Sequence, residues 1–548
     1  MIETEVHQRL RAYLREQGQH TQWPHHLTMA RLVARALRVG RSALIQIDAL
    51  AAYQGSHRLS YLIPALLWPG PAVLALPDYL LKTVLQQDIP DLQQALPIIK
   101  SVRVGNRWPE DDFRGLLITS AQSWVRTQLQ HYTNQGRPKL PCNIPTLIDG
   151  AHDLERWVQD ALSIRLSAQD WDALMLAFPS QQDFIRDRRV RITHAIFQHP
   201  ANPYSCHLIE DPEKTLLNKL YEQLTLHSDH GQMPLRWQAF WERFQSDPAE
   251  RLAWSQLDRT MGSLSLCSGP TDINAALTPV WEKQPVVLIG TALDESDRAE
   301  RYRERLGLGD LTCLKFGPDR RNDLLQLYLP DKLPMPNTSQ FKAAALQEIR
   351  RLLNAQGIVS SPTVIIVGDV PLKAQFAAIL AAEFGSRVRL EAPIESQGIL
   401  ITGWEYWRSQ QQIQLQKALL PGLMIIPTLP IPSLENPLVA GRVAAYKRRR
   451  QDWFKAYLLP AALSRLQSAI APLRARQLVC CRLQPAQNPS LVALLDNRVN
   501  HRSYGTQVLD ALSPIARSSY LNLDWFTDSS NISMEDTPLE DHASLDPQ

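Results

Sequence analysis

SALIQIDALAAYQGSHRLSYLIPALL, residues 42–67, opens with a short apolar strand and runs through a polar loop into the start of a helix. The strand at 42–47 lacks the alternation of a half-exposed strand, which is typical of parallel strands covered on both faces. Similar apolar runs recur along the chain, with helical spacing between them. This alternation, present twice, predicts two α/β domains with parallel sheets. The further strand candidates lie within 64–77, 115–120, 146–150, 286–291, 363–369, 398–403, 423–430 and 491–496.

Length and composition support a multidomain globular protein. The 548 residues exceed the roughly 250–300 at which a single hydrophobic core stops growing. Apolar residues make up 44 % of the chain and charged residues 21 %, and no uncharged apolar run approaches the ~18 residues of a membrane span. The first residues carry charges throughout and lack an apolar signal core. We therefore expect a cytoplasmic protein without a membrane partner.

Residues 155–262 depart from the strand–helix pattern on either side of them. Their apolar spacing is helical, including that of RLAWSQLDRT at 251–260, and their tryptophans sit at amphipathic positions that favour core packing. We predict a mainly helical insertion in the first α/β domain. The predicted division is 1–154 for the first part of domain 1, 155–262 for the insertion, 263–312 for the return of domain 1 with a linker, 313–527 for domain 2, and 528–548 for an acidic tail. The tail has six acids and no Lys or Arg, which predicts disorder.

Positive charge is concentrated in residues 435–482, which hold ten Lys and Arg against two acids. Aromatic residues such as Trp453 and Tyr457 are interleaved with the cations. Ion pairing and base stacking together would suit a nucleic-acid strand. An ordinary solvated helix surface explains the same residues equally well. The candidate contacts, which we call the basic stripe, are Arg442, Lys447, Arg448, Arg449, Arg450 and Lys455.

A nucleic-acid motor of this architecture needs the phosphate loop G-x-x-x-x-G-K-[ST] after its first strand, because its backbone N–H groups, Lys and hydroxyl hold the phosphates and Mg²⁺. The loop after 42–47 keeps one glycine, Gly55, followed by Ser56, His57 and Arg58. No Lys anywhere in the chain follows a Gly. A standard phosphate loop is therefore excluded.

A second nucleotide-binding strand should end in Asp-Glu, where the Asp holds Mg²⁺ and the Glu polarises the attacking water. The run at 146–150 ends instead in Asp149 and Gly150, with His152 after them. Asp149 remains a candidate Mg²⁺ ligand, whereas glycine occupies the position of the catalytic carboxylate. His152 is either a degenerate site residue or only a helix cap. The six cysteines form no CxxC pair, so we expect no iron–sulfur cluster.

Over roughly residues 20–515 the chain resembles the DinG-type, XPD-related superfamily 2 DNA helicases. The segments that carry the resemblance occur in the family's order and include LIDGAHDLE at 147–155, ENPLVAGRVAAYK at 435–447 and LLDNRVNHRSYG at 494–505. The resemblance implies two RecA-like domains, with a mainly helical arch-type insertion in the first. It also implies a cleft for ATP and a single strand crossing both domains.

The same resemblance assigns nucleotide contacts, several of them degraded. The adenine-reading position falls on His26, the phosphate-loop Lys at about Arg58, and the Mg²⁺-binding hydroxyl on Ser56 or Ser60. The sixth motif keeps Gln467 and Arg474 but has Ala471 in place of its first arginine. Weak binding of ATP and Mg²⁺ stays open. The implied contacts are His26, Gly55, Ser56, Arg58, Ser60, Asp149, Gln467 and Arg474.

The phosphate loop, the catalytic carboxylate and the first arginine of the sixth motif all serve ATP hydrolysis. The loss of all three therefore points to the loss of that one reaction. We expect a helicase-like nucleic-acid-binding protein whose ATP hydrolysis is lost or severely weakened. Its partners would be single-stranded or branched DNA and a protein of DNA repair or replication. Two alternatives stay open: an ATP-dependent DNA helicase with a divergent nucleotide site, and a protein-interaction scaffold that binds no nucleic acid.

Overall fold

The computed structural model describes residues 2–16, 23–97, 100–132, 140–226, 233–247, 249–318, 324–356, 361–416, 419–483 and 489–526. The chain forms two compact units. The first unit comprises Met1–Pro318 and Pro430–Ala469, and the second comprises Asp319–Leu429 and Ile470–Gln548. The acidic tail predicted at 528–548 lies outside the described residues. No helix among the described residues is long and apolar enough to cross a membrane.

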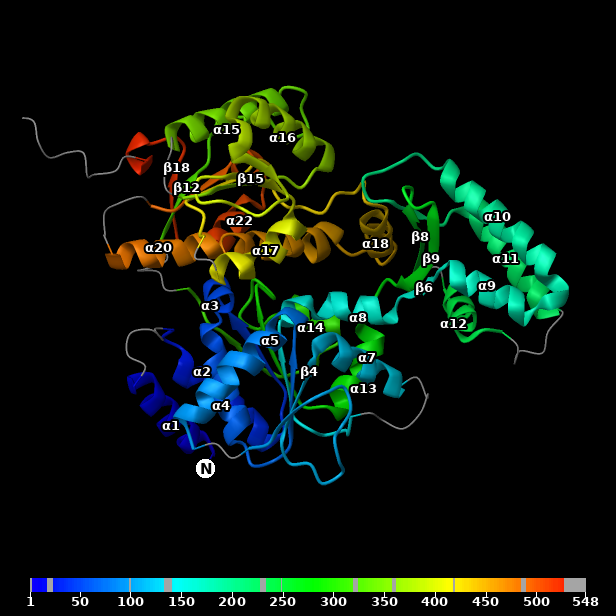
Figure 1. The fold of residues 1–548 in the computed structure, drawn as a ribbon, viewed down its shortest axis with the longest axis horizontal. Coiled ribbons are helices and arrows are strands. Elements are labelled where there is room, and N and C mark those ends of the chain that lie inside the picture. The colour runs from blue at the N-terminus through cyan, green and yellow to red at the C-terminus, as the bar shows by residue number, and fades with distance from the viewer. Residues whose placement is uncertain are drawn as a thin grey trace, which may run out of the picture. The chain divides into compact units, whose positions relative to one another are not determined.

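The first unit is built on a seven-stranded sheet with the order β11-β1-β10-β5-β2-β4-β3. Its strand β4 is labelled in Figure 1. Every strand pair in the sheet is parallel, as predicted. Its inner strands are buried on both faces, which explains their unbroken apolar sequences. The strands are β1 (Ala43–Ile47), β2 (Ala72–Leu76), β3 (Val102–Val104), β4 (Leu116–Ser120), β5 (Thr146–Asp149), β10 (Val286–Thr291) and β11 (Thr312–Lys315).

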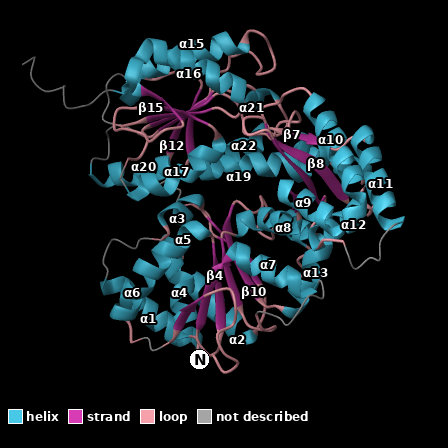
Figure 2. Cartoon of the chain, turned by 45° about the vertical axis from the view of Figure 1, so that its right-hand side comes forward, coloured by secondary structure: helices cyan, strands magenta, loops and turns pink. Residues whose placement is uncertain are grey.

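Helices cover both faces of this sheet and form two separate cores (Figure 2). One core lies under α1 (Ile2–Glu16), α2 (His26–Val39), α4 (Leu59–Leu67), α5 (Asp78–Thr83) and α6 (Ile89–Ala95). The other lies under α7 (Ala121–Tyr132), α8 (Leu154–Leu162), α13 (Asn274–Lys283) and α14 (Glu300–Leu306). Both faces are thus buried, as the apolar strands require.

The second unit repeats the architecture with a second seven-stranded parallel sheet, of order β14-β15-β13-β16-β17-β12-β18. Its strands are β12 (Leu325–Tyr328), β13 (Thr363–Ile366), β14 (Val388–Leu390), β15 (Ile399–Thr402), β16 (Leu423–Ile426), β17 (Leu491–Leu494) and β18 (Ile515–Ser518). Its helices are α15 (Phe341–Gln356), α16 (Val370–Phe384), α17 (Trp404–Gln416), α20 (Ala471–Leu483), α21 (Arg498–His501) and α22 (Gly505–Leu512). The prediction of two parallel-sheet domains is therefore confirmed.

The insertion in the first unit is mainly helical but also contains a four-stranded antiparallel sheet, β6-β9-β8-β7. Its buried tryptophans, Trp171, Trp237 and Trp241, form its core as predicted. Its helices are α9 (Ala168–Ala177), α10 (Gln182–Gln198), α11 (Asp211–Leu226) and α12 (Leu235–Phe244). Its strands are β6 (Ile164–Leu166), β7 (Cys206–Leu208), β8 (Arg251–Asp258) and β9 (Ser263–Pro270).

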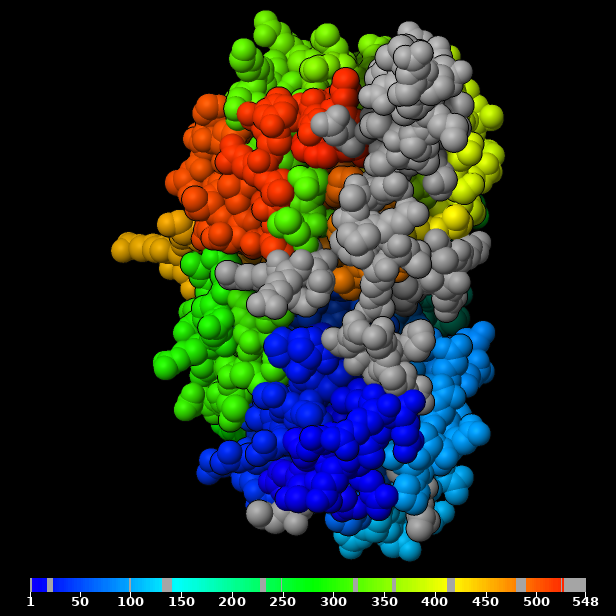
Figure 3. Space-filling view, turned by 90° about the vertical axis from the view of Figure 1, so that its left-hand side faces the viewer, coloured from blue at the N-terminus to red at the C-terminus, as the bar shows by residue number. Residues whose placement is uncertain are grey.

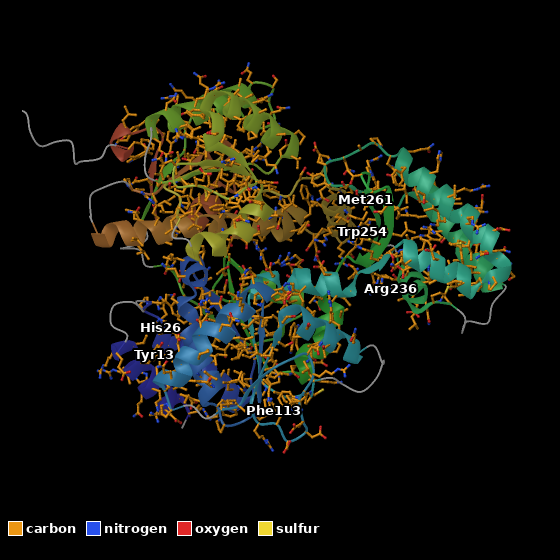
Figure 4. All side chains as sticks on the ribbon, in the orientation of Figure 1. Tyr13, His26, Phe113, Arg236, Trp254 and Met261 are labelled. Atoms are coloured by element: carbon orange, nitrogen blue, oxygen red, sulfur yellow. The ribbon has the colours of Figure 1, made fainter. Side chains whose placement is uncertain are left out.

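Three expectations for the insertion were wrong. Its sheet includes β9, so the insertion extends beyond the predicted end at residue 262. The stretch 251–260 is a strand and turn rather than a helix, because Asp258 pairs with Ser263 across a tight turn that Gly262 enters at φ 60°. Trp254 and Met261 lie on this hairpin (Figure 4). The helix α8, predicted as part of the insertion, belongs to the core of the first sheet, where Trp157 and Val158 are buried.

Residues 430–469, predicted to fold with domain 2, are part of the first unit. Their first helix, α18 (Pro437–Arg448), packs on strands β7 and β8 of the insertion. The fit is close at Gly441, where a Cβ would lie 2.3 Å from Cδ1 of Leu252. The π-helical turn η8 (Phe454–Leu458) and helix α19 (Leu459–Ala469) follow, and α19 contacts α3 (Ala49–Gln54) of the same unit.

Candidate functional site

The segment after β1, where a phosphate loop would lie, is folded into helices. Asp48 ends the strand and caps α3, since its Oδ1 accepts a hydrogen bond from the backbone N of Ala51 at 2.7 Å. Trp23 holds the other carboxylate oxygen through its indole N–H at 3.0 Å. The N-terminus of α3, which would favour a phosphate, therefore already faces a carboxylate of the chain itself.

The turn between α3 and α4 is closed by Arg58. Its guanidinium lies over Gly55, where a Cβ would be only 1.8 Å from Nη1, and the glycine has φ 73°. The same guanidinium donates from Nε to Oδ2 of Asp88 at 2.6 Å. Burial alone would lower the pKa of Arg58, but the ion pair with Asp88 outweighs burial and raises it. Arg58 thus neutralises Asp88.

Asp149, at the end of β5, is buried and makes hydrogen-bond contacts with three groups of the chain. Its Oδ2 lies 3.2 Å from Nε2 of His57 and accepts from the Tyr61 hydroxyl at 2.9 Å. Its Oδ1 accepts from the backbone N of Gly150 at 2.7 Å. Burial raises the pKa of Asp149, but the charge of His57 and these three hydrogen bonds hold the pKa below its ordinary value. We call Asp149, His57 and Tyr61 the Asp149 cluster.

His57 and Tyr61 were not among the predicted site residues. The second nitrogen of the His57 ring, Nδ1, lies 3.2 Å from the carbonyl oxygen of Ala51, so the imidazole bridges α3 and the tip of β5. The available signal was their spacing of four residues, which places two polar side chains on one side of the helix start.

His26 and Ser60, two predicted nucleotide contacts, lie against each other. Nδ1 of His26 is 3.0 Å from the Ser60 hydroxyl, and both residues are buried. Burial, with smaller effects of His57 and His25, lowers the pKa of His26 to about 4, so the ring is neutral at pH 7. Ser56, the other candidate hydroxyl, lies 3.4 Å from the carbonyl oxygen of Ala51.

The glycine that stands at the catalytic-carboxylate position is required by the backbone. Gly150 has φ 78°, and a Cβ there would lie 2.6 Å from Cγ of Pro77 and 3.2 Å from the Trp157 ring. His152 lies half-buried in the short turn η4 (Ala151–Asp153) after it. This turn is fixed by the Tyr302 hydroxyl, which donates to the carbonyl oxygen of Ala151 at 2.6 Å.

The two retained residues of the sixth motif lie in different units. Gln467 is on α19 of the first unit, and Arg474 is on α20 of the second. Arg474 is buried and donates to the carbonyl oxygens of Leu512 and Pro514, at 2.6 and 3.4 Å. It therefore binds the chain segment that joins α22 to β18.

The basic stripe divides into two groups. Arg442 donates to the side-chain oxygen of Gln159, and Arg449 pairs with Asp272 at 2.8 Å, so these two arginines hold α18 against the rest of the first unit. The other four cations are exposed. They include Lys447, whose ammonium lies 5.4 Å from the centre of the Trp453 ring. The exposed cations are Lys447, Arg448, Arg450 and Lys455.

In this arrangement the predicted contacts do not fit ATP and Mg²⁺. The carboxylate that would hold Mg²⁺ is buried and already bound by His57, Tyr61 and a backbone N–H, and the arginine at the phosphate-loop position is paired with Asp88. Within the part of the chain that the structure describes, no group of three or more His, Cys, Asp or Glu side chains is arranged to hold a metal ion.

Comparison with known proteins identifies the fold. No model of a protein family and no curated protein matches the sequence. A solved structure titled XPD helicase matches 90 % of this chain and 99 % of its own, with 11 % identity and a TM-score of 0.55. Xpd4 of S. tokodaii covers the same shares at 11 % identity, with a TM-score of 0.52. The chain therefore has the fold of these helicases: two RecA-like domains, with an insertion in the first.

Proposed function

We propose that this chain is a helicase-like protein of the DinG/XPD type that binds single-stranded or branched DNA without hydrolysing ATP. Its place would be in DNA repair or replication, beside a protein partner from one of those processes. The observation that carries the proposal is the Asp149 cluster, in which His57 and Tyr61 take up the carboxylate that would otherwise serve Mg²⁺.

Three independent features support the absence of hydrolysis. The space after β1 is filled by a capped helix, the arginine that replaces the loop Lys is paired with Asp88, and the backbone at Gly150 has no room for a carboxylate side chain. Phosphoryl transfer depends on positioning and on charge stabilisation, and each of these changes removes a part of that machinery. Binding of a strand needs only cations and stacking surfaces, which the exposed part of the basic stripe retains.

Phosphate release in the presence of single-stranded DNA tests the loss of hydrolysis. We expect no DNA-stimulated release from the full chain, and no change in melting temperature on adding ATP with Mg²⁺. The matched variant is Asp149→Ala. Stimulated release that this variant abolishes would overturn the proposal in favour of a working helicase with a divergent site.

A salt titration tests strand binding. Fluorescence anisotropy with a labelled single strand should show an affinity that falls steeply with salt, with a slope of about −0.7 per phosphate contact. The variant Lys447→Glu/Lys455→Glu should weaken binding at least tenfold, whereas Lys332→Glu/Lys342→Glu, the same charge change at exposed residues of the second unit, should leave it nearly unchanged. Undetectable binding at low salt would favour the scaffold alternative.

A further inference from the structure

Helix α2 is divided into an apolar side and a side that carries arginines. Its apolar side, with Met29, Val33 and Leu37 fully buried, packs on α1 and α4. The opposite side carries Arg31, Arg35 and Arg38, all exposed. Their spacing of four and then three residues places them in one row along the helix. We call these three residues the arginine row.

The positive charge of the arginine row is only partly neutralised. Arg38 pairs with Glu3 of α1 at 2.7 Å. No carboxylate among the described residues pairs with Arg31 or Arg35. Residues 26–41 contain no Asp or Glu, and Arg41 adds a fourth arginine two residues beyond the end of the helix. Figure 3 shows the N-terminal residues, in blue, on the outer surface of the first unit.

The chemistry of this surface suits phosphates more than bases. An arginine fork can bind two phosphate oxygens at once, so a row of exposed arginines is well suited to a phosphate backbone. Arg31 and Arg38 are seven residues apart, which is about 10 Å along the helix at 1.5 Å per residue. That length equals the rise of about three base pairs along the axis of a duplex, at 3.4 Å each.

The arginine row differs from the basic stripe in its aromatic residues. The only Phe, Tyr or Trp of α1 and α2 is Tyr13, and it is buried, so neither helix offers an exposed ring on which an unpaired base could stack. In the stripe, Trp453 lies beside the exposed Lys447. A surface with cations and no stacking ring gains nothing from unpaired bases, which favours a duplex, whose bases are already stacked.

We propose that the arginine row binds the phosphate backbone of a nucleic-acid duplex. This inference rests on the proposed function and extends it. The protein would hold duplex on α2 and a single strand on the stripe, so its preferred ligand would be a junction between the two.

Anisotropy with three labelled probes of equal length tests the inference: a blunt duplex, a single strand, and a junction with a single-stranded tail. Arg31→Glu/Arg35→Glu should weaken duplex binding at least tenfold and lower the magnitude of its salt slope by nearly 2, at about 0.9 per phosphate. It should leave single-strand binding within twofold of the unchanged protein. Arg31→Gln/Arg35→Gln should give a smaller loss in the same direction.

Each result decides between the two proposals. If both Arg31/Arg35 variants kept the duplex affinity and salt slope of the unchanged protein, the proposal that the arginine row binds a duplex would be overturned. An acidic protein would then be the better candidate partner for this surface. An equal loss in Lys332→Glu/Lys342→Glu would also overturn it, because the effect would then follow net charge alone. Loss of single-strand binding in Lys447→Glu/Lys455→Glu, with duplex binding intact, would support the proposed function. It would also support a separate duplex site, which the Arg31 and Arg35 variants then test directly.

Discussion

Nε2 of His57 lies 3.2 Å from Oδ2 of Asp149, at the end of the strand where a P-loop enzyme holds its metal ion. The two side chains belong to segments 92 residues apart, and both are buried. This contact connects the turn before α4 to the centre of the first sheet. It gives Asp149 a structural role, because the carboxylate holds two helices through His57 and Tyr61.

Removing His57 should destabilise the protein much more than removing the Tyr61 hydroxyl. His57→Ala leaves the buried Asp149 carboxylate with two of its three partners and also breaks the contact with Ala51, and losing both contacts at a buried site should cost roughly 3–5 kcal/mol. Tyr61→Phe removes one hydrogen bond to a charged group and should cost about 1.5–3 kcal/mol. Urea unfolding of both variants measures the difference. Equal midpoints for the two would contradict this role of the contact.

Acid should destabilise the first unit through His26. Its pKa is lowered to about 4 when folded, against an ordinary value of about 6.5 in the unfolded chain. Between these values the unfolded state binds a proton that the folded state does not. Stability is therefore fully present above pH 6.5 and falls as the pH drops towards 4, by roughly 3 kcal/mol in total.

The variant His26→Gln tests this dependence. Urea midpoints measured from pH 4 to 7 should vary less in His26→Gln than in the unchanged protein. The exposed His501→Gln is the control for the loss of a histidine. The same pH profile in all three proteins would contradict the burial argument.

Restoring a glutamate at position 150 should not restore a motor. Gly150→Glu forces a side chain into φ 78° and into contact with Pro77, so we expect a loss of about 2–4 kcal/mol and no phosphate release. Gly40→Ala is the matched control, because Gly40 has φ 65° but open space around it and should lose only about 1 kcal/mol. Thermal unfolding and phosphate release are the measurements. If Gly150→Glu were stable and hydrolysed ATP, the missing carboxylate at position 150 would be the only obstacle to hydrolysis.

Arg474 should matter for stability and leave phosphate release unaffected. Arg474→Ala leaves the carbonyl oxygens of Leu512 and Pro514 without these donors in a buried setting, which should cost about 2–4 kcal/mol. The loss should appear as an earlier thermal transition, and strand affinity of the folded variant should be unchanged. If Arg474→Ala kept full stability but bound ATP more weakly than the unchanged protein, Arg474 would be a nucleotide contact after all.

Much of the fold was predictable, because buried parallel strands leave a plain signal. The predicted runs at 42–47, 286–291 and 423–430 correspond to β1, β10 and β16, which are buried along their whole length. Most of the parallel strands that were missed lie at sheet edges, such as β3 and β18, where half-exposed positions interrupt the apolar run. Strand β8 of the insertion was missed because its pairing with β9 overrides a helical spacing.

The position of the candidate site was predictable from the sequence, but the side chains that bind its residues were not. The place of Asp149 at the end of a strand followed from the sequence. That His57 would bind it depends on how α3 fills the loop after β1, which is a matter of tertiary packing. The role of Arg58 depended in the same way on Asp88, thirty residues further along the chain.

Residues 430–469 fold with the first unit although they lie between two strands of the second sheet, and this affects folding during synthesis on the ribosome. Strands β16 and β17 are neighbours in the second sheet, yet the chain between them leaves to complete the first unit. The first unit therefore cannot finish folding when residue 318 emerges, and it must wait until α18 and α19 have been made. A truncation before residue 430 should expose the face of β7 and β8 that α18 covers, whereas one made after 469 should keep that face covered and leave only the second sheet incomplete.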